Sequence, residues 1–225
     1  MLHLLSLSAC APQSWRNGGG TTRELLRWPA AMGHEGEAAG AANTATDDPW
    51  LVRVSVAEIA RDGPFSPFPG VDRWFAVLEG AGVRLALPEG AEARRPGDDA
   101  LAFAGEAAPG CRLIDGATSD LNLMVRRAAS TAGSPGATGA ASAAHAGTNA
   151  RPTASMRLAA PGSVQRGRRP WRALYAHAPC RLLADDDWHD LPAGTLAWSD
   201  ANRAETWELA EAGLAFWMSF EPGSP

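Results

Sequence analysis

Three segments of the chain carry polar side chains at alternate positions, opposite apolar ones. Alternate side chains of a strand point to the same face, so each segment would have one polar and one apolar face. Arginine presents a planar, bidentate fork that matches a carboxylate, whereas amide and acidic groups can bind an amide, a formyl group or an amine. The polar positions are Thr22, Glu24, Arg53, Ser55, Asp120, Asn122 and Arg126.

A glycine-rich stretch, WRNGGGTTRE over residues 15–24, lies where the first of these segments begins. Glycine has no Cβ, so it can adopt positive φ and let a ligand approach the main chain. One interpretation is a ligand-binding loop in which Gly18 and Gly19 offer backbone N–H groups beside the amide of Asn17. The alternative is a tight turn between two strands. A P-loop is excluded because its spacing and its lysine are absent.

Two interpretations of the polar faces are open. The faces could meet water, as in a half-exposed antiparallel sheet, or they could line the mouth of a barrel that holds a small ligand. In the second case Arg53 or Arg126 would bind a carboxylate, and Asn17 and Asn122 would bind an amide or formyl group. The chain would then bind a small anionic metabolite, and more readily as a binding or regulatory protein than as an enzyme.

An enzyme without a metal is the alternative function. Glu24 or Asp120 could act as a general base if burial raises its pKa. An isomerase, a lyase or a hydrolase would fit such a site, although no nucleophile–base pair is recognisable in the sequence.

The segment 63–73, GPFSPFPGVDR, alternates prolines with aromatic residues and predicts a rigid connector. We expect Phe65 and Phe68 to plug one end of a barrel. The alternative is that Ser66 or Arg73 reaches the pocket.

Charge and composition exclude several functions. The net charge is −5, and no basic stripe is present, so a nucleic-acid partner is not expected. All 20 basic residues are arginine, which excludes lysine nucleophiles and Schiff bases.

Metal-ligand spacings are absent from the sequence. The three cysteines are scattered, and the five histidines form no HxH or HxxxH pair. Four aspartates lie near His189, which favours a solvated acidic turn over a calcium loop. We therefore expect no metal and no cofactor.

The N-terminal segment resembles a lipoprotein cleavage box only over Leu7–Cys10. A positive n-region is absent and the apolar run is too short for a signal peptide. No run reaches the roughly 18 apolar residues that a membrane span requires. The expected localisation is therefore cytoplasmic, with no membrane partner.

Short apolar runs broken by Gly, Pro and Asp predict an all-β sandwich or barrel. Residues 56–61 alone could form a helical turn. Strands are predicted near 2–8, 21–28, 50–58, 73–79, 82–87, 100–104, 111–114, 120–127, 171–177, 180–184, 195–199, 205–210 and 213–220.

The chain divides into two β halves separated by a segment of low complexity. Residues 1–127 form the first half, and 166–225 form a shorter half that is expected to pack against it. The segment 128–165 has few large apolar residues and is expected to be disordered for the most part. A second insertion is expected at 30–48.

The order of four motifs in the first half resembles the HutD/Ves family, bacterial proteins often linked with histidine utilisation. The motifs cover most of 12–127, and the second half matches only in its β pattern. They are WRNGGGTTRE (15–24), RVSVAEIA (53–60), GPFSPFPGVDR (63–73) with LEG (78–80), and CRL (111–113) followed by DLNLMVRR (120–127).

The resemblance implies a cupin-like antiparallel β-barrel that is duplicated and lacks the usual metal histidines. It also implies a role in modulating histidine utilisation, through a ligand of the formyl- or formimidoyl-glutamate type. Exposed strand edges make a homodimer a further expectation.

Overall fold

The computed structural model describes residues 1–29, 50–127 and 153–222 of the chain. Every regular element in these residues is a β-strand, apart from the short 3-10 turns η1 (Leu7–Ala9) and η2 (Gly105–Ala107). The described strands form four sheets in which all pairs are antiparallel, so the all-β prediction is confirmed. No helix in this part of the chain is long and apolar enough to cross a membrane.

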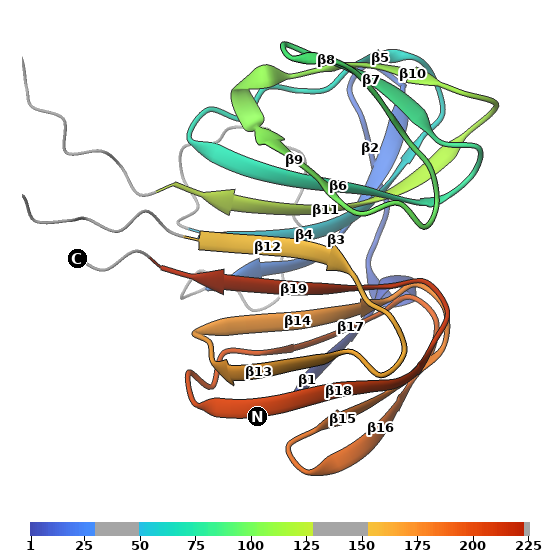
Figure 1. The fold of residues 1–225 in the computed structure, drawn as a ribbon. Coiled ribbons are helices and arrows are strands. Elements are labelled where there is room, and N and C mark those ends of the chain that lie inside the picture. Colours follow the sequence, from blue (N-terminus) through green and yellow to red (C-terminus); the bar gives the residue numbers. More distant parts are fainter. Residues whose placement is uncertain (30–49, 128–152, 223–225) are drawn as a thin grey trace, which may run out of the picture.

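A six-stranded and a four-stranded sheet enclose the first barrel, in the upper half of Figure 1. The six-stranded sheet carries the three segments with alternating polar side chains. In spatial order it contains β2 (Gln13–Ser14), β3 (Gly20–Trp28), β4 (Val52–Ile59), β11 (Thr118–Arg126), β6 (Val71–Glu79) and β9 (Leu101–Ala104). The four-stranded sheet contains β5 (Gly63–Pro64), β10 (Gly110–Leu113), β7 (Val83–Leu87) and β8 (Gly90–Arg94).

The second barrel repeats this arrangement in the lower half of Figure 1. Its larger sheet contains β1 (His3–Ser6), β17 (Thr195–Ser199), β14 (Trp171–Ala176), β19 (Ala215–Glu221) and β12 (Thr153–Leu158). Its smaller sheet contains β13 (Val164–Arg168), β18 (Ala204–Ala212), β15 (Cys180–Ala184) and β16 (Asp187–Leu191).

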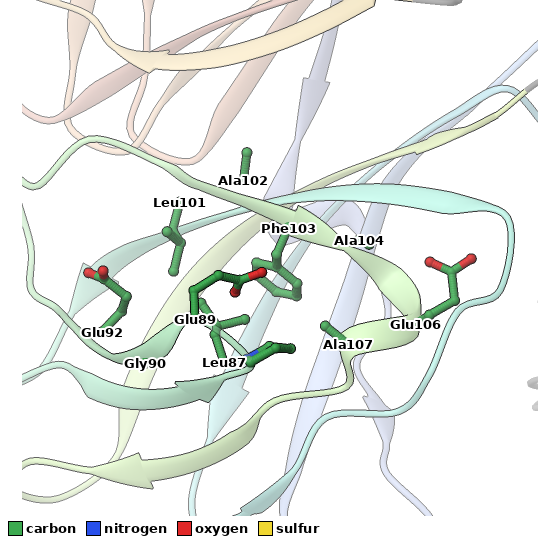
Figure 2. Close-up of a pocket in the computed structure, with 11 residues that line it drawn as sticks. Leu87, Glu89, Gly90, Glu92, Leu101, Ala102, Phe103, Ala104, Glu106 and Ala107 are labelled. Carbon is green, nitrogen blue, oxygen red and sulfur yellow. The ribbon is translucent and has the colours of Figure 1, made fainter.

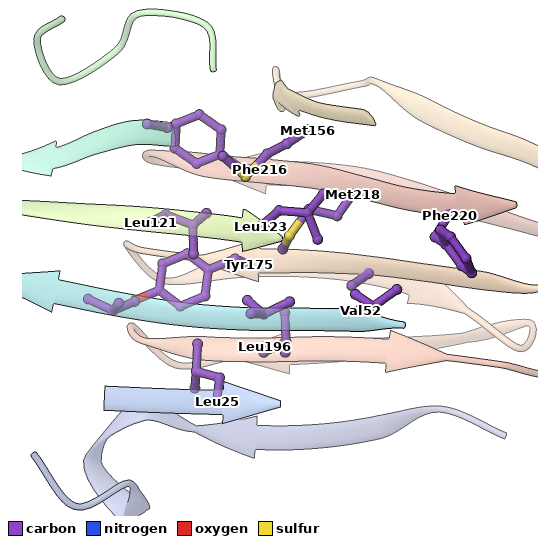
Figure 3. Packing of buried hydrophobic residues seen from close by; sticks show 14 of the residues in the cluster. Leu25, Val52, Leu121, Leu123, Met156, Tyr175, Leu196, Phe216, Met218 and Phe220 are labelled. Carbon is purple, nitrogen blue, oxygen red and sulfur yellow. The ribbon is translucent and has the colours of Figure 1, made fainter. Parts of the chain in front are cut away.

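The two larger sheets pack face to face and bury the main hydrophobic core between them (Figure 3). Val52, Val54 and Leu123 come from the first barrel, and Phe216 and Met218 come from the second. Because side chains alternate along a strand, burying these residues between the sheets turns the polar positions of β4 and β11 into the first barrel. The predicted sharing of one face by the valines is confirmed.

The boundary between the two barrels does not follow the chain order, because the second barrel also contains a strand from the N-terminal segment. The first strand of the chain, β1, pairs with β17 of the second barrel. Residues 153–158 form β12, which pairs with β19, so the expectation of disorder over 128–165 is wrong for this part. Few large apolar side chains are needed there, because an edge strand gains stability from main-chain hydrogen bonds to its neighbour. The segments 30–48 and 128–152 lie outside the described residues.

Each strand predicted from the sequence has a counterpart, but β2, β5, β8 and β13 were not predicted. Local secondary structure also differs from two of the sequence expectations. Residues 56–61 are not helical, because β4 continues to Ile59. The acidic cluster around His189 is a turn only at Asp185 and Asp186, which have positive φ, and Asp187–Leu191 forms β16 against β15. The polar side chains of β16 lie mostly on its exposed face, and in the sequence their close spacing favoured a solvated turn over a strand.

Candidate functional site

The polar faces of β3, β4 and β11 line the inside of the first barrel. Ser55 and Asn122 are each 2% exposed, and Asp120 is 1% exposed. The interpretation that these faces meet water is therefore wrong at the centre of the sheet. Polar groups buried to this extent must find partners within the protein or on a ligand.

Two arginines face each other across Met124 in one row of this sheet. Arg53 on β4 and Arg73 on β6 are both in register with Met124 on β11. The Nη1 atom of Arg53 lies 3.7 Å from Met124 Sδ, and Arg73 is 8% exposed. Burial lowers the pKa of Arg73, the charge of Asp120 opposes this effect, and the charge of Arg53 adds to it. The two cations therefore repel each other. An anion between them would relieve this repulsion.

Glu24 lies beside the arginine row and pairs with two cations. Its Oε2 atom is 2.5 Å from Arg53 Nε, and its Oε1 atom is 2.7 Å from Arg27 Nε. Residues three apart on a regular strand point to opposite faces, but a bulge between Glu24 and Leu26 shifts the register so that Arg27 lies opposite Arg53. The bulge also brings Leu25 and Leu26 together on the apolar side.

A hydrogen-bonded chain links Arg73, Asn122 and Asp120. Asn122 Oδ1 accepts bonds from Arg73 Nε at 2.8 Å and Nη2 at 2.5 Å, and Asn122 Nδ2 donates to Asp120 Oδ1. The Oδ2 atom of Asp120 has no hydrogen-bond partner among the described residues. Burial raises the pKa of Asp120 to about 7, against the opposing effects of the Arg73 charge and the Asn122 hydrogen bond. Asp120 can therefore accept a ligand N–H or exchange a proton near neutral pH.

Aromatic rings enclose the guanidinium group of Arg73. Its Cζ atom lies 4.3 Å from the centre of the Phe65 ring and 5.6 Å from that of Phe103. Burial lowers the pKa of Arg73 to about 10, so the group remains charged at neutral pH. Of the other connector residues, Ser66 is exposed and Phe68 packs against the cluster at the end of the barrel. Phe65 therefore forms part of the site wall, as well as filling the barrel.

Arg73 was predicted to reach the pocket only as an alternative, although the alternation of side chains along its strand indicates that it points into the barrel. Arg73, Phe75 and Val77 alternate toward the barrel interior, where all three are buried. Asp72 points the other way and pairs with Arg127 Nη1 at 2.8 Å. The proline-rich segment just before this strand obscured the alternation.

The glycine-rich stretch forms the turn between β2 and β3. Gly18 has a φ of 65°, and the Gly19 N–H donates to Asn17 Oδ1 at 2.9 Å. A Cβ atom on Gly20 would lie 2.1 Å from the carbonyl oxygen of Glu58, so the neighbouring strand requires glycine there. The fold therefore accounts for these residues, and their contact with a ligand stays a prediction.

The predicted residues Thr22 and Arg126 lie toward opposite ends of the polar face. Thr22 Oγ1 accepts a hydrogen bond from Trp15 Nε1 at 2.8 Å. Arg126 is half-buried, and its Cζ atom lies 4.9 Å from the centre of the Trp50 ring. The structure thus brings Glu24, Arg53, Ser55, Asp120 and Asn122 together with Arg73. Thr22 and Arg126 flank this group.

The groups near this site that could ligate a metal or act as a nucleophile include the Cys111 thiol. No group of three or more His, Cys, Asp or Glu residues that could hold a metal occurs in the described ranges. Cys111 lies in the barrel core, and burial raises the pKa of its thiol to about 12. The thiolate form that would act as a nucleophile or a metal ligand is therefore scarce at neutral pH.

Sequence comparison identifies relatives of this chain. The HutD family model matches residues 8–191. A Pseudomonas putida protein described as an uncharacterised protein in the hutC 3′ region is 38% identical over 125 residues, which cover 55% of this chain and 57% of that protein. Protein Ves of Citrobacter koseri is 37% identical over 118 residues, which cover 50% and 52% of the two chains. The chain thus spans about half the length of these curated relatives.

Structural comparison supports the duplicated cupin-like fold. A conserved protein of unknown function from Pseudomonas aeruginosa PAO1 has a TM-score of 0.71 at 22% identity, and HutD from Pseudomonas fluorescens SBW25, solved in a formate condition, has 0.71 at 20%. Both matches cover 100% of each chain. A cupin 2 conserved barrel protein from Leptotrichia buccalis has a TM-score of 0.51 at 11% identity and covers 96% of this chain and 94% of its own. These similarities establish the fold.

Proposed function

Because this chain belongs to the HutD family, we propose that it binds a small carboxylate-bearing metabolite inside its first barrel, without a metal, and thereby modulates histidine utilisation. The observation that carries the proposal is the pair of arginines, Arg53 and Arg73, that face each other across Met124. Among the described residues, the guanidinium groups of Arg53 and Arg73 lie beside two carboxyl groups, Glu24 and Asp120. Burial raises the pKa of Asp120 to about 7, so this carboxyl group is only partly ionised at neutral pH. The cluster therefore keeps a net positive charge that a ligand carboxylate can balance.

The groups beside the arginines suit a ligand that also contains an amide or an amidine. The unpartnered Oδ2 atom of Asp120 can accept an N–H, and Asn122 lies between that atom and Arg73. An N-formyl or N-formimidoyl amino acid contains a carboxylate and an N–H close together. The family and the position of the P. putida relative near hutC support such a ligand from the histidine pathway.

Binding should be visible as a shift of the melting temperature. We expect N-formylglutamate or N-formimidoylglutamate to raise it by about 5–10 °C at 100 times the dissociation constant, because a ligand that binds only the folded state stabilises it by about 2.7 kcal/mol. Glutamate, urocanate, histidine and formate should give smaller shifts. Differential scanning fluorimetry of the full chain measures this.

The Arg53→Met variant should lose most of the shift, whereas Arg84→Met, at an exposed position on β7, should keep it. The proposal is wrong if no carboxylate in this set shifts the melting temperature of the wild-type protein, or if both variants respond equally.

A metal-free enzyme is the second candidate function. The specific observation is Asp120, since a buried carboxyl group whose pKa is raised to about 7 can act as a general acid or base at neutral pH. No comparable observation favours Glu24, whose carboxylate pairs with two arginines.

If the protein turns over a formylated or formimidoylated amino acid, Asp120→Asn should lower kcat by about 100-fold or more while the ligand still binds. Product formation followed by NMR, together with the binding constant of the variant, tests this. Binding without any turnover by the wild-type protein would exclude the enzyme for these ligands.

A further inference from the structure

An open groove of about 540 Å³ lies between β8 and β9, outside the interior cluster (Figure 2). These strands are the edges of the two sheets of the first barrel, and neither pairs with the other. The volume lies within the range of about 300–1,000 Å³ that is typical of small-molecule sites. The groove is therefore the seam at which the barrel is left open, and it is large enough for a small organic molecule.

The floor of the groove is apolar. It contains Leu87 from β7 and Leu101 and Phe103 from β9. Phe103 also lies near Arg73 on its inner side, so its ring separates the groove from the barrel interior. A flat apolar group could lie on this floor and remove it from water.

The rim of the groove is acidic, and no basic side chain is among its lining residues. Glu92 pairs with Arg94 at 3.2 Å. Glu106 accepts the Gly70 N–H at 2.7 Å, which lowers the pKa of its carboxyl group, and it also pairs with Arg127 Nη2. Glu89 makes no ion pair or hydrogen bond with any residue that the structure describes.

Glu89 lines the same groove as Leu101 and Phe103, and Figure 2 draws its side chain between those of Glu92 and Glu106. An unpaired carboxylate above an apolar floor matches a ligand with a flat apolar body and one positive charge. Glu92 and Glu106 are already paired with Arg94 and Arg127, so Glu89 is the carboxylate that would repel an anion in the groove. A metal ion would not cover the apolar floor or remove it from water.

We propose that the groove between β8 and β9 binds a small organic cation with a flat apolar body, such as an aromatic amine or amidine, and that Glu89 pairs with its positive group. This site differs from the interior cluster in location and in the charge that it selects. It goes beyond the proposed function and does not depend on it.

Benzamidine, benzamide and benzoate provide a matched set of probes, because they share one ring and differ in charge. In an NMR titration of the full chain, benzamidine should shift the amide resonances of residues 87–92 and 101–107, benzamide should shift them less, and benzoate should leave them unchanged. Raising the ionic strength should weaken the benzamidine effect, because salt screens an exposed ion pair.

The Glu89→Gln variant should raise the dissociation constant of benzamidine about three- to fivefold, the effect expected of one solvent-exposed ion pair. Glu58→Gln removes an exposed carboxylate from β4 and should change nothing. Phe103 is not a suitable test position, because it also contacts Arg73.

Three results would overturn the proposal. One is equal binding of benzamidine and benzamide, which would show that charge is not selected. Another is a set of perturbed resonances outside the groove. The third is binding of triarginine without binding of benzamidine, which would assign the groove to a basic peptide instead.

Discussion

Replacing Arg73 by methionine is expected to weaken carboxylate binding by about 10- to 100-fold, the loss of one or two charge-assisted hydrogen bonds in a buried site. Arg73 is buried between two phenylalanine rings and faces Arg53 across Met124. Water cannot replace its guanidinium group easily there, so the ligand would lose both the hydrogen bonds and the attraction. Isothermal titration calorimetry with N-formylglutamate or N-formimidoylglutamate would measure the change.

Methionine keeps the unbranched apolar stem of the side chain as far as the position of Nε, so the barrel should still fold. Removing one partner of a buried charge pair is usually destabilising, but Asp120 can take up a proton when Arg73 is absent, because burial already raises its pKa to about 7. The Asn122 oxygen loses its two donors, which we expect to cost about 1–3 kcal/mol.

Arg84→Met serves again as the matched control for this variant. Unchanged affinity in a folded Arg73→Met protein would show that the ligand does not reach the arginine pair. Loss of binding together with loss of folding would be resolved by Arg73→Gln, which keeps donor groups for Asn122.

Asp120 is expected to make stability fall as the pH rises from about 4 to 7. Its pKa in the folded protein is about 7, and that of an aspartate in an unfolded chain is about 3.9. The folded state therefore holds the proton more tightly. The stabilisation is complete below pH 4 and is lost as the pH rises through 7, a change of about 4 kcal/mol in the free energy of unfolding.

The Asp120→Asn variant lacks this titration but can keep the hydrogen bond to Asn122, because its side-chain oxygen can still accept from Asn122 Nδ2. Urea unfolding of both proteins between pH 4 and 8 should show the variant gaining stability relative to the wild type as the pH rises. Asp115→Asn, at an exposed position, should run parallel to the wild type. A constant difference between Asp120→Asn and the wild type would mean that Asp120 is already ionised at pH 4.

The sequence was sufficient to predict most of the strands and the faces of the central ones. In the segments 51–56 and 120–126, apolar and polar residues alternate so regularly that one face had to be buried against another layer. The valines of β4 and the leucines of β11 do lie in the core between the larger sheets. The family could also be recognised from the sequence, because the order of its four motifs is a property of the chain that does not depend on folding.

Alternation could not show what lies opposite the polar face. A strand with one polar face looks the same whether that face meets water or the inside of a barrel, and only the closing four-stranded sheet buries Asp120 and Asn122. The pKa of Asp120 depends on this burial, so it could not be predicted from neighbouring residues in the sequence.

Sequence alone thus determined which residues share a strand face, because that follows from a local period of two. The tertiary structure decided which faces meet. It placed Arg73 opposite Arg53, turned Arg27 toward Glu24 through a bulge, and added β1 to the second barrel. Register, bulges and strand partners depend on the packing of segments far apart in the chain, and no local pattern contains that information.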